Sequence, residues 1–328
     1  IQEEAENPKE KPDFYEVHGQ DGAKRAALVA AAGFHNLLMI GPPGAGKSMI
    51  ASRIPGILPS MTEEEAIELS AIYSVIGKLP PNGSLIRERP FRAPHHTITA
   101  KALCGGGTIP GPGEISLAHC GVLFLDELPE FHRETLEVLR QPLENGSMQI
   151  HRCGYTYDFP AQFMLVAAMN PCPCGFYPNL SRCHCSYTAV RRYQEKISMP
   201  LLDRMDMMIE VSALSYPQWN QKTQEMSSTQ MRKKVERVRE IQKERRKGQS
   251  FLFNSRMGNQ ELEEYCALGT QEKKLMKKAF DELKMSARGY TKILKVARTI
   301  ADLEEKEWIQ TEHLQEALCY RTGSGIYQ

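Results

Sequence analysis

Apolar residues gather in short runs at four places along the chain, and a polar residue or a glycine follows each run. The runs are Leu37–Ile40, Val122–Leu125, Phe163–Met169 and Met207–Val211. Short apolar runs of this kind are typical of strands in a parallel sheet that helices cover on both faces. The pattern therefore predicts an α/β fold with a buried parallel sheet.

Helical patterns lie between these strands. An alanine-rich run from Ala23 to Ala32 predicts a helix that Gly33 ends. A capping box at Thr62–Glu65 opens a second helix, and 131–143 predicts a third. One side of the second helix is expected to carry Ile67, Ser70, Ala71 and Val75.

Two stretches outside these helices predict insertions. Met148–Arg152 and Tyr155–Phe159 alternate around Cys153-Gly154, which predicts a β-hairpin. The stretch from Pro80 to Pro112 is rich in Pro, Gly and His and has no period, so we expect functional insertions there.

The chain divides into three parts. Residues 1–13 form an expected solvated linker, residues 14–218 the α/β core, and residues 219–328 a smaller C-terminal helical domain, because helical spacing dominates from Gln260 onward. We expect the boundary near residues 215–225. The chain begins at Ile1 in an acidic stretch, which suggests that a preceding domain has been removed.

Composition narrows the class of protein only moderately. The 328 residues are 41% hydrophobic and 25% charged, as in a globular protein, and the net charge of +1 favours no partner. No apolar run reaches the length of a membrane helix and no signal peptide pattern opens the chain, so we expect a cytoplasmic protein without a membrane partner.

The stretch from Gly41 to Ser48 carries the clearest chemistry. It fits the pattern G-x-x-x-x-G-K-[ST] between a buried strand and a predicted helix. In such a loop backbone amides surround a phosphate chain, Lys47 reaches the outer phosphates, and the Ser48 hydroxyl binds Mg²⁺. The expected ATP-binding residues here are Gly41, Pro42, Pro43, Gly44, Ala45, Gly46, Lys47, Ser48 and Met49.

Polar residues at the ends of two later strands could complete this site. Asp126 and Glu127 follow the second apolar run, where Asp126 would hold Mg²⁺ and Glu127 would deprotonate the attacking water. Asn170 follows the third run and could position that water. The alternatives are a plain core strand for the first pair and a turn residue for Asn170.

Four of the nine cysteines cluster as two C-x-C pairs, Cys172/Cys174 and Cys183/Cys185. Four soft ligands can close a tetrahedral Zn²⁺ site. His184 could replace one thiolate, and free or redox-active thiols or simple packing are the alternatives.

Three basic features could act on ligands. Arg204 could reach the γ-phosphate of a neighbouring subunit or pair with Asp203 or Asp206. Arg288 opens a helix and could touch the nucleotide or only cap the helix. Residues 231–247 hold nine basic residues and three glutamates, which indicates either a nucleic-acid surface or a solvated helix.

With these motifs in order, the chain resembles the AAA+ ATPases, and more closely the magnesium-chelatase-like ComM/YifB group. The residues that carry the resemblance are Val17–Gln20, Gly41–Ser48, Arg89–His96, Pro112–Ser116, Asp126-Glu127, Asn170–Gly175 and Leu202–Arg204.

The resemblance implies a role for each site residue. Lys47/Ser48 and Asp126/Glu127 match the Walker A and Walker B positions, and Val17 and His18 join the nucleotide-binding residues. Asn170 matches sensor 1, Arg204 the arginine finger and Arg288 sensor 2. It assigns no role to His95 and His96, for which pore-loop and packing roles are both open.

The resemblance also implies a function. Such proteins are ring-forming ATPases, expected here as a homo-hexamer, and the best-studied members are DNA helicases that promote branch migration in natural transformation and recombination on single-stranded or branched DNA. They normally carry an N-terminal Lon-protease-like domain, and we expect that this sequence is a trimmed chain from which that domain has been removed. Remodelling of a protein client, as in magnesium chelatase, and a nucleotide-dependent scaffold are the alternatives.

Overall fold

The computed structural model describes residues 12–107, 110–152, 154–214, 216, 225–246 and 253–322. Most of the expected linker and the expected domain boundary at 218/219 lie outside these residues. No helix in the described ranges is long and apolar enough to cross a membrane.

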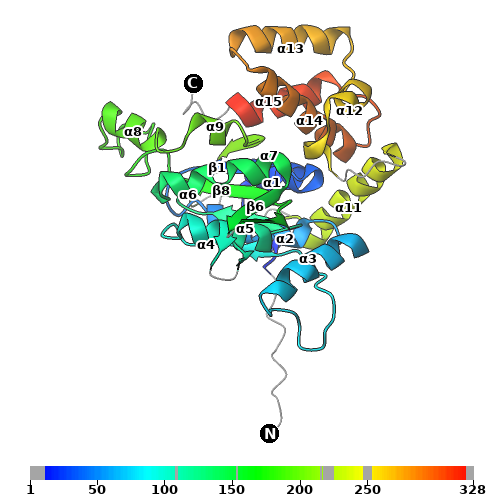
Figure 1. Cartoon of the computed structure of the whole chain (residues 1–328). Helices are drawn as coiled ribbons and strands as arrows, with labels where there is room; N and C mark the ends of the chain where they lie inside the picture. The colour runs from blue at the N-terminus through cyan, green and yellow to red at the C-terminus, as the bar shows by residue number, and fades with distance from the viewer. Residues whose placement is uncertain are drawn as a thin grey trace.

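Five strands form a central sheet in which every neighbouring pair is parallel (Figure 1). In spatial order they are β2 (Phe91–Arg92), β5 (Val122–Leu125), β8 (Met164–Met169), β1 (Leu37–Ile40) and β9 (Met207–Glu210). The four apolar runs thus become four of the five strands, and the prediction of a parallel α/β sheet is confirmed. All the strands point the same way, so the residues that follow them meet at one edge.

Both faces of this sheet are buried. In β1, for example, Leu37 and Met39 belong to one hydrophobic cluster, whereas Leu38 and Ile40 belong to another on the opposite face. Successive side chains of a strand point to opposite faces, so a strand that is apolar at every position needs cover on both.

Helices provide that cover. One face packs against α1 (Asp21–Gly33), α2 (Lys47–Ile57), α11 (Ser228–Arg245) and α14 (Ala287–Leu303). The other packs against α4 (Ala100–Cys104), α5 (Glu114–Leu117), α6 (Arg133–Glu137) and α7 (Arg140–Asn145). The remaining helices are α3 (Glu63–Val75), α8 (Tyr187–Gln194), α9 (Met199–Leu202), α12 (Asn259–Tyr265), α13 (Thr270–Glu282) and α15 (Thr311–Thr322), with short 3₁₀ helices at Phe14–Glu16, Leu128–Glu130 and Asn254–Arg256.

The first helix ends at Gly33, as expected, but Gly33 is not the left-handed residue at its end. Gly33 is the last residue of α1, and Phe34 takes the left-handed conformation at its end, with φ of 56°. A Cβ on Gly33 would lie 2.2 Å from the His35 ring and 2.6 Å from Thr299 Oγ1. Glycine at position 33 therefore serves close packing at the end of the helix, and Phe34 takes the left-handed conformation.

Two other helix predictions need correction. The capping box of Thr62 and Glu65 is present, but Ile67 and Val75 are exposed and the inward side of α3 carries Ala66, Leu69 and Ile72. The single helix expected over 131–143 is instead the pair α6 and α7, which meet at Val138-Leu139.

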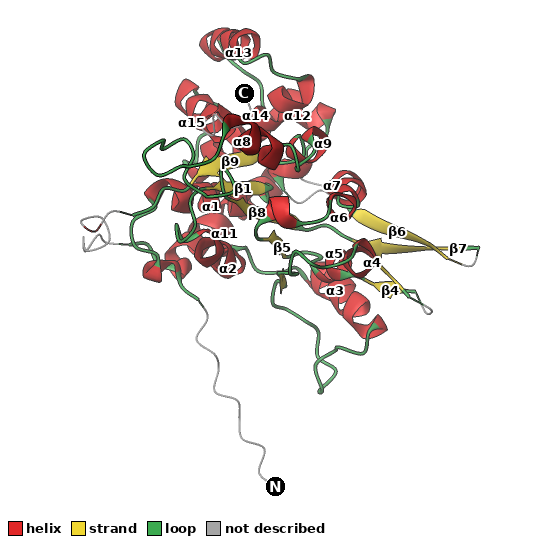
Figure 2. Ribbon diagram, turned by 90° about the vertical axis from the view of Figure 1, so that its left-hand side faces the viewer, coloured by secondary structure: helices red, strands yellow, loops and turns green. Residues whose placement is uncertain are grey.

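The predicted hairpin is confirmed as the antiparallel pair β6 (Ser147–Arg152) and β7 (Tyr155–Pro160). Figure 2 shows it projecting from the body of the molecule beside β4 (Gly111–Pro112). That short strand pairs with β3 (Gly105–Gly106) inside the expected insertion. The insertions therefore lie side by side.

The C-terminal helices lie above the sheet in Figure 1. They do not have a separate core, because α11 and α14 share one hydrophobic cluster with α1, α2 and the sheet. The helical domain is therefore packed firmly onto the α/β core.

Candidate active site

The Gly41–Ser48 loop joins the end of β1 to the start of α2. Gly46 caps the helix in the left-handed conformation, with φ of 88°, which favours glycine. Gly41 has no space for a side chain, because a Cβ there would lie 2.0 Å from the Val211 carbonyl oxygen. The two glycines thus allow the chain to turn tightly between strand and helix.

Lys47 lies inside this turn and is largely buried. Its Nζ donates to the carbonyl oxygens of Gly41 and Pro42, at 2.7 and 2.9 Å, and to Asn170 Oδ1 at 3.2 Å. Burial lowers the pKa of Lys47, while the charges of Asp126 and Glu127 act in the opposite direction. The amine is thereby held at the mouth of the loop, next to the expected sensor residue.

Ser48 and Asp126 form the oxygen pair expected of a Mg²⁺ site. The Ser48 hydroxyl donates to Asp126 Oδ2 at 2.6 Å, and Asp126 Oδ1 accepts the Glu127 backbone N–H at 2.9 Å. Hard divalent cations prefer such oxygens, so these residues fit Mg²⁺.

Glu127 has a contact that sequence reasoning missed. Its Oε2 lies 3.3 Å from His96 Nδ1, and the Glu127 side chain is otherwise largely exposed. The His96 ring lies against the His95 ring, with centroids 4.0 Å apart, and meets the edge of Phe131. The His-His pair thus places one imidazole against the expected catalytic base. Adjacent histidines gave no periodic signal that could have predicted this contact.

A pocket of about 370 Å³ unites these groups. Its lining includes all of the expected residues from Pro43 to Met49, together with Asp126, Glu127 and Asn170. Val17 and His18 do not line it: Val17 is buried in the core and His18 is exposed. Nearby Gln20 does contact the loop, donating to the Ala45 carbonyl oxygen at 3.1 Å. A nucleotide-binding role for Val17 and His18 stays a prediction.

Arg204 and Arg288 lie together at the opposite edge of the sheet. Both pair with Glu144, Arg288 at 3.1 Å, and Arg204 also donates to the Pro200 carbonyl oxygen at 2.6 Å. The Asn36 side chain, just before β1, donates to the Arg204 carbonyl oxygen, whereas the phosphate loop follows the end of β1. From Asn36 to Gly41 the extended chain advances five residues, so the two edges are about 16 Å apart.

These arginines line a second hollow of about 360 Å³ that also receives Arg256, Lys292 and Lys295. Arg204 is largely buried, burial lowers its pKa, and its Nε has no hydrogen-bond partner. The expected pairing of Arg204 with Asp203 or Asp206 is not seen; Glu144 takes that place, and Asp206 pairs with Lys292 at 3.0 Å. The hollow therefore concentrates positive charge away from the chain's own phosphate loop.

The four clustered cysteines converge in the loop after β8. Their Sγ atoms all lie within 4.8 Å of one another, and His184 is exposed and outside the group. The expectation that this histidine could replace a thiolate is therefore not supported, because its side chain does not enter the cluster.

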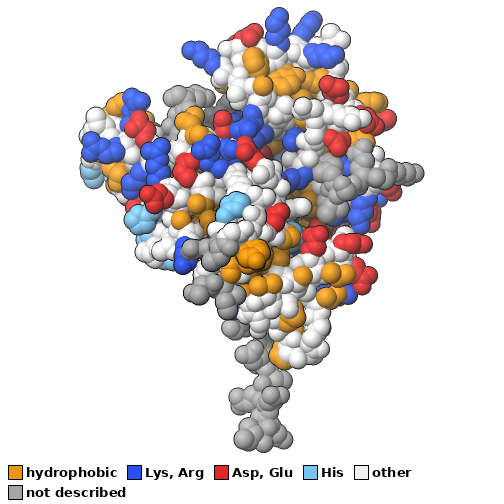
Figure 3. All heavy atoms as spheres, in the orientation of Figure 1, with side chains coloured by type: hydrophobic (Ala, Val, Ile, Leu, Met, Phe, Trp, Pro, Cys, Tyr) orange, Lys and Arg blue, Asp and Glu red, His pale blue; other side chains and the backbone are white. Residues whose placement is uncertain are grey.

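The basic run at 231–247 is divided by the fold, and Lys247 lies outside the described residues. Arg239 packs over the Phe253 ring at 4.3 Å, Arg245 pairs with Asp302, and Arg246 donates to Asn254 Oδ1 at 2.8 Å. Lys233, Lys234 and Lys243 are exposed. On the face drawn in Figure 3, basic and acidic side chains are interspersed. Part of the run thus has a structural role, and DNA binding by the remainder stays a prediction.

The fold and the phosphate pocket define the class: this is an AAA+ P-loop protein, with a parallel α/β core and a C-terminal helical domain. The family model described as magnesium chelatase, subunit ChlI, matches residues 13–219, and that of the ChlI C-terminal region matches residues 225–321. The chain belongs to the magnesium chelatase ChlI family.

Curated relatives support the same family. The chain is 48% identical over 319 residues to the competence protein ComM of Haemophilus influenzae and 45% identical over 312 residues to the uncharacterized protein YifB of Escherichia coli. These matches cover 96% and 94% of the chain but only 61% and 60% of the relatives. The magnesium-chelatase 38 kDa subunit of Acidiphilium rubrum is 25% identical over 180 residues, which cover 48% of the chain and 52% of that subunit.

Proposed function

We propose that the chain is the motor part of a cytoplasmic ATPase that assembles into a ring, expected as a hexamer, and acts on DNA. One observation carries the proposal. The phosphate pocket and the Arg204/Arg288 pair lie at opposite edges of the same sheet. A chain arranged in this way can complete a nucleotide site only when the arginine edge of one subunit faces the phosphate edge of the next.

The residues of the pocket would share the work of hydrolysis. Mg²⁺ would be held by Ser48 and Asp126 and, when bound, would offset charge on the phosphates. Lys47 would bind the outer phosphates, and Glu127 would accept a proton from the attacking water. Asn170, whose amide oxygen touches Lys47, would orient that water. Zn²⁺ has no part in this step, because the cysteines do not line the pocket.

Arg204 and Arg288 would serve the neighbouring subunit. A guanidinium brought in from another chain stabilises charge that develops in the transition state, so it raises the rate and ties hydrolysis to assembly. Releasing Arg204 from Glu144 would free it for a phosphate. We therefore place the sensor-2 arginine, like the arginine finger, on the neighbour's nucleotide.

DNA is the favoured client for three reasons. The chain is similar to a protein named for competence. The projecting hairpin exposes Tyr155 and Tyr157, and aromatic rings can stack on bases of a single strand. Exposed lysines of α11 add positive charge. ATP hydrolysis would move the hairpin and the neighbouring insertion, and these would in turn move a DNA strand held in the centre of the ring.

A protein client is the second candidate, and the family description favours it. The matching models are those of a magnesium chelatase subunit, and one relative bears that name. A nucleotide-dependent scaffold is the non-enzymatic alternative, which the paired Asp126 and Glu127 argue against.

The test is the ATPase rate over a range of protein concentrations, with and without single-stranded and branched DNA. Glu127→Gln serves as the blank. A rate that rises cooperatively with protein and again with DNA supports the proposal. A cooperative rate that ignores DNA favours a protein client, and ring formation with negligible hydrolysis favours the scaffold.

A further inference from the structure

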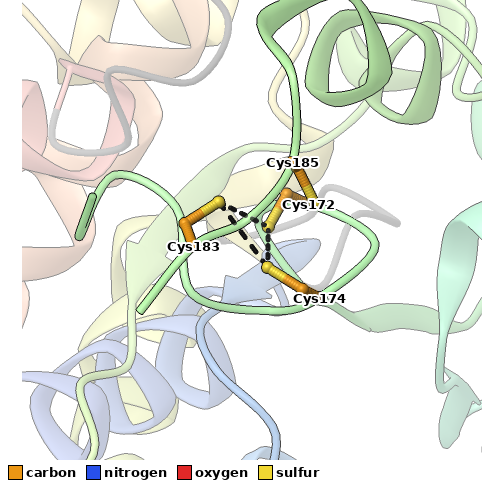
Figure 4. Close-up of side chains that lie close together, drawn as sticks. All are labelled: Cys172, Cys174, Cys183 and Cys185. Carbon is orange, nitrogen blue, oxygen red and sulfur yellow. Dashed lines mark hydrogen bonds between the residues drawn. The ribbon is translucent and has the colours of Figure 1, made fainter. Parts of the chain in front are cut away.

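We infer that Cys172, Cys174, Cys183 and Cys185 bind one Zn²⁺ ion, and that this metal site braces the phosphate-binding loop. Figure 4 shows the four side chains converging from two turns of the loop between β8 and α8. The site lies outside the hydrolytic machinery, so the inference goes beyond the proposed ATPase function.

The distances among three of the sulfur atoms match a single tetrahedral ion, and the Cys185 sulfur lies within 4.8 Å of each of them. Four thiolates at about 2.3 Å from Zn²⁺ lie about 3.8 Å from one another. The Sγ of Cys172 lies 3.4 Å from that of Cys174 and 3.8 Å from that of Cys183, and Cys174 and Cys183 are 3.6 Å apart. A disulfide needs about 2.05 Å, and all four cysteines are free. The cluster therefore has the size of a mononuclear site.

The surroundings also fit a structural metal. Cys172 is fully buried and Cys183 nearly so, and around them lies only a small apolar group with Val190, Phe176 and Tyr177. So small a core stabilises little on its own, and such loops commonly depend on a metal. The Tyr177 backbone N–H donates to Cys172 Sγ at 3.4 Å, a contact that orients a thiolate ligand. On binding one Zn²⁺ the four thiols would release four protons.

The loop that carries the four cysteines, Cys172–Cys185, packs directly against the phosphate-binding loop. Gly175, one residue after Cys174, has φ of 85°, and a Cβ on it would lie 2.4 Å from Pro43 Cδ. At its other end, Cys172 follows Asn170 by two residues, and the Asn170 side chain touches Lys47. Gln194 in α8 donates to the carbonyl oxygen of Pro171 at 3.1 Å. A metal that fixes this loop would hold Pro43 and Asn170 in place.

The first experiment measures metal content of the full chain, purified without chelator and without added zinc. We expect about one zinc per chain, as for a structural tetrathiolate site. Cys174→Ser and Cys185→Ser, both at half-buried positions, should lose most of it, whereas Cys104→Ser and Cys319→Ser should retain it as matched controls. Co²⁺ substitution should give thiolate-to-cobalt charge-transfer absorption in the native chain only. Folding is checked by circular dichroism.

Three results would overturn the site: a folded wild-type chain without metal, iron in place of zinc, or disulfides among the four cysteines by mass spectrometry. None of these depends on ATPase activity, so the proposed function can fail independently.

Gly175→Ala tests separately whether the cysteine loop holds the phosphate-binding loop in place through Pro43. The substitution should leave zinc content unchanged but weaken binding of a fluorescent ATP analogue several-fold, because the new methyl group displaces Pro43. Removal of zinc by chelation should also weaken binding of the ATP analogue. If nucleotide affinity is unchanged both in Gly175→Ala and after removal of zinc, the cysteine loop does not hold the phosphate-binding loop in place.

Discussion

At the scale of single residues, Lys47 and Glu127 should separate binding from chemistry. Lys47→Ala removes the amine that would bind the outer phosphates, so ATP binding should be lost. Glu127→Gln keeps the shape of the pocket but cannot take a proton, so ATP should bind while turnover falls by at least about 100-fold. Equilibrium binding and single-turnover hydrolysis measure the two effects. Tight ATP binding by Lys47→Ala would contradict the assignment of the pocket.

His96 should act on the rate through Glu127. Its Nδ1 lies 3.3 Å from the carboxylate, so His96→Ala should leave that side chain free to rotate. We expect kcat to fall by roughly 10-fold with little change in ATP affinity, because a misplaced catalytic base slows the chemical step but does not weaken nucleotide binding. His96→Gln, which keeps a hydrogen-bond donor, should recover part of the loss.

Exposed His132 provides the matched control for His96. His132→Ala should leave kcat unchanged, because this residue caps α6 without a side-chain hydrogen bond. An equal loss of rate in both variants would mean that the effect of His96 is not specific to Glu127.

At the scale of elements, a buried ion pair joins Asp206, the residue before β9, to Lys292 of α14. Asp206 Oδ1 lies 3.0 Å from Lys292 Nζ, and Asp206 Oδ2 accepts the Asn36 backbone N–H at 2.9 Å. Burial alone would raise the pKa of Asp206, but the charge of Lys292, the nearby His35 ring and the hydrogen bond from the Asn36 backbone N–H hold that pKa far below its usual range. The carboxylate is therefore stabilised in its charged form.

Removing that charge should destabilise the protein. Asp206→Asn leaves Lys292 buried without its partner, so the free energy of unfolding should fall by about 3 kcal/mol at neutral pH. A carboxyl whose folded pKa is depressed contributes stability that is complete above the unfolded pKa of about 4 and is lost as the pH falls below it. The difference between wild type and variant in urea unfolding should therefore shrink below about pH 4.

Asp203→Asn is the control for the joint, because Asp203 is only half-buried and makes no such pair. It should change the free energy of unfolding by no more than about 0.5 kcal/mol. If both substitutions cost the same at neutral pH, the ion pair is not what joins the two elements.

Much of the fold was predictable from the sequence because its signals are local. Apolar runs placed four strands, and the glycine-lysine loop with Asp126 and Asn170 followed from the polar residues that end those strands. The exposure of Ile67 and the joining of the C-terminal helices to the main core could not be predicted, because both depend on which faces meet in space. The contacts of Glu127 with His96 and of Arg204 with Glu144 were missed for the same reason, since each joins residues far apart along the chain.

At the scale of the whole molecule, the proposed nucleotide site is divided between the two edges of the sheet, and this proposal can be tested by mixing subunits. Lys47→Ala damages the phosphate edge, and Arg204→Ala damages the arginine edge. Each variant alone should be inactive. In a mixed ring, an Arg204→Ala subunit can supply an intact phosphate edge to the intact arginine edge of a Lys47→Ala subunit, so one complete site forms between them. Activity should therefore reappear on mixing, with a maximum near equal amounts.

The control for this mixture is Arg191→Ala, which alters an exposed arginine of α8 that lines neither the phosphate pocket nor the arginine hollow and should keep full activity alone. Arg288→Ala should behave like Arg204→Ala, because both arginines hold the same glutamate. It should also regain activity when mixed with Lys47→Ala. Recovery would show that both arginines act on a neighbour's nucleotide. If an Arg288→Ala protein is inactive alone and is not rescued by Lys47→Ala subunits that rescue Arg204→Ala, then Arg288 must turn toward its own chain's pocket, and the helical domain would have to move relative to the sheet during the ATPase cycle.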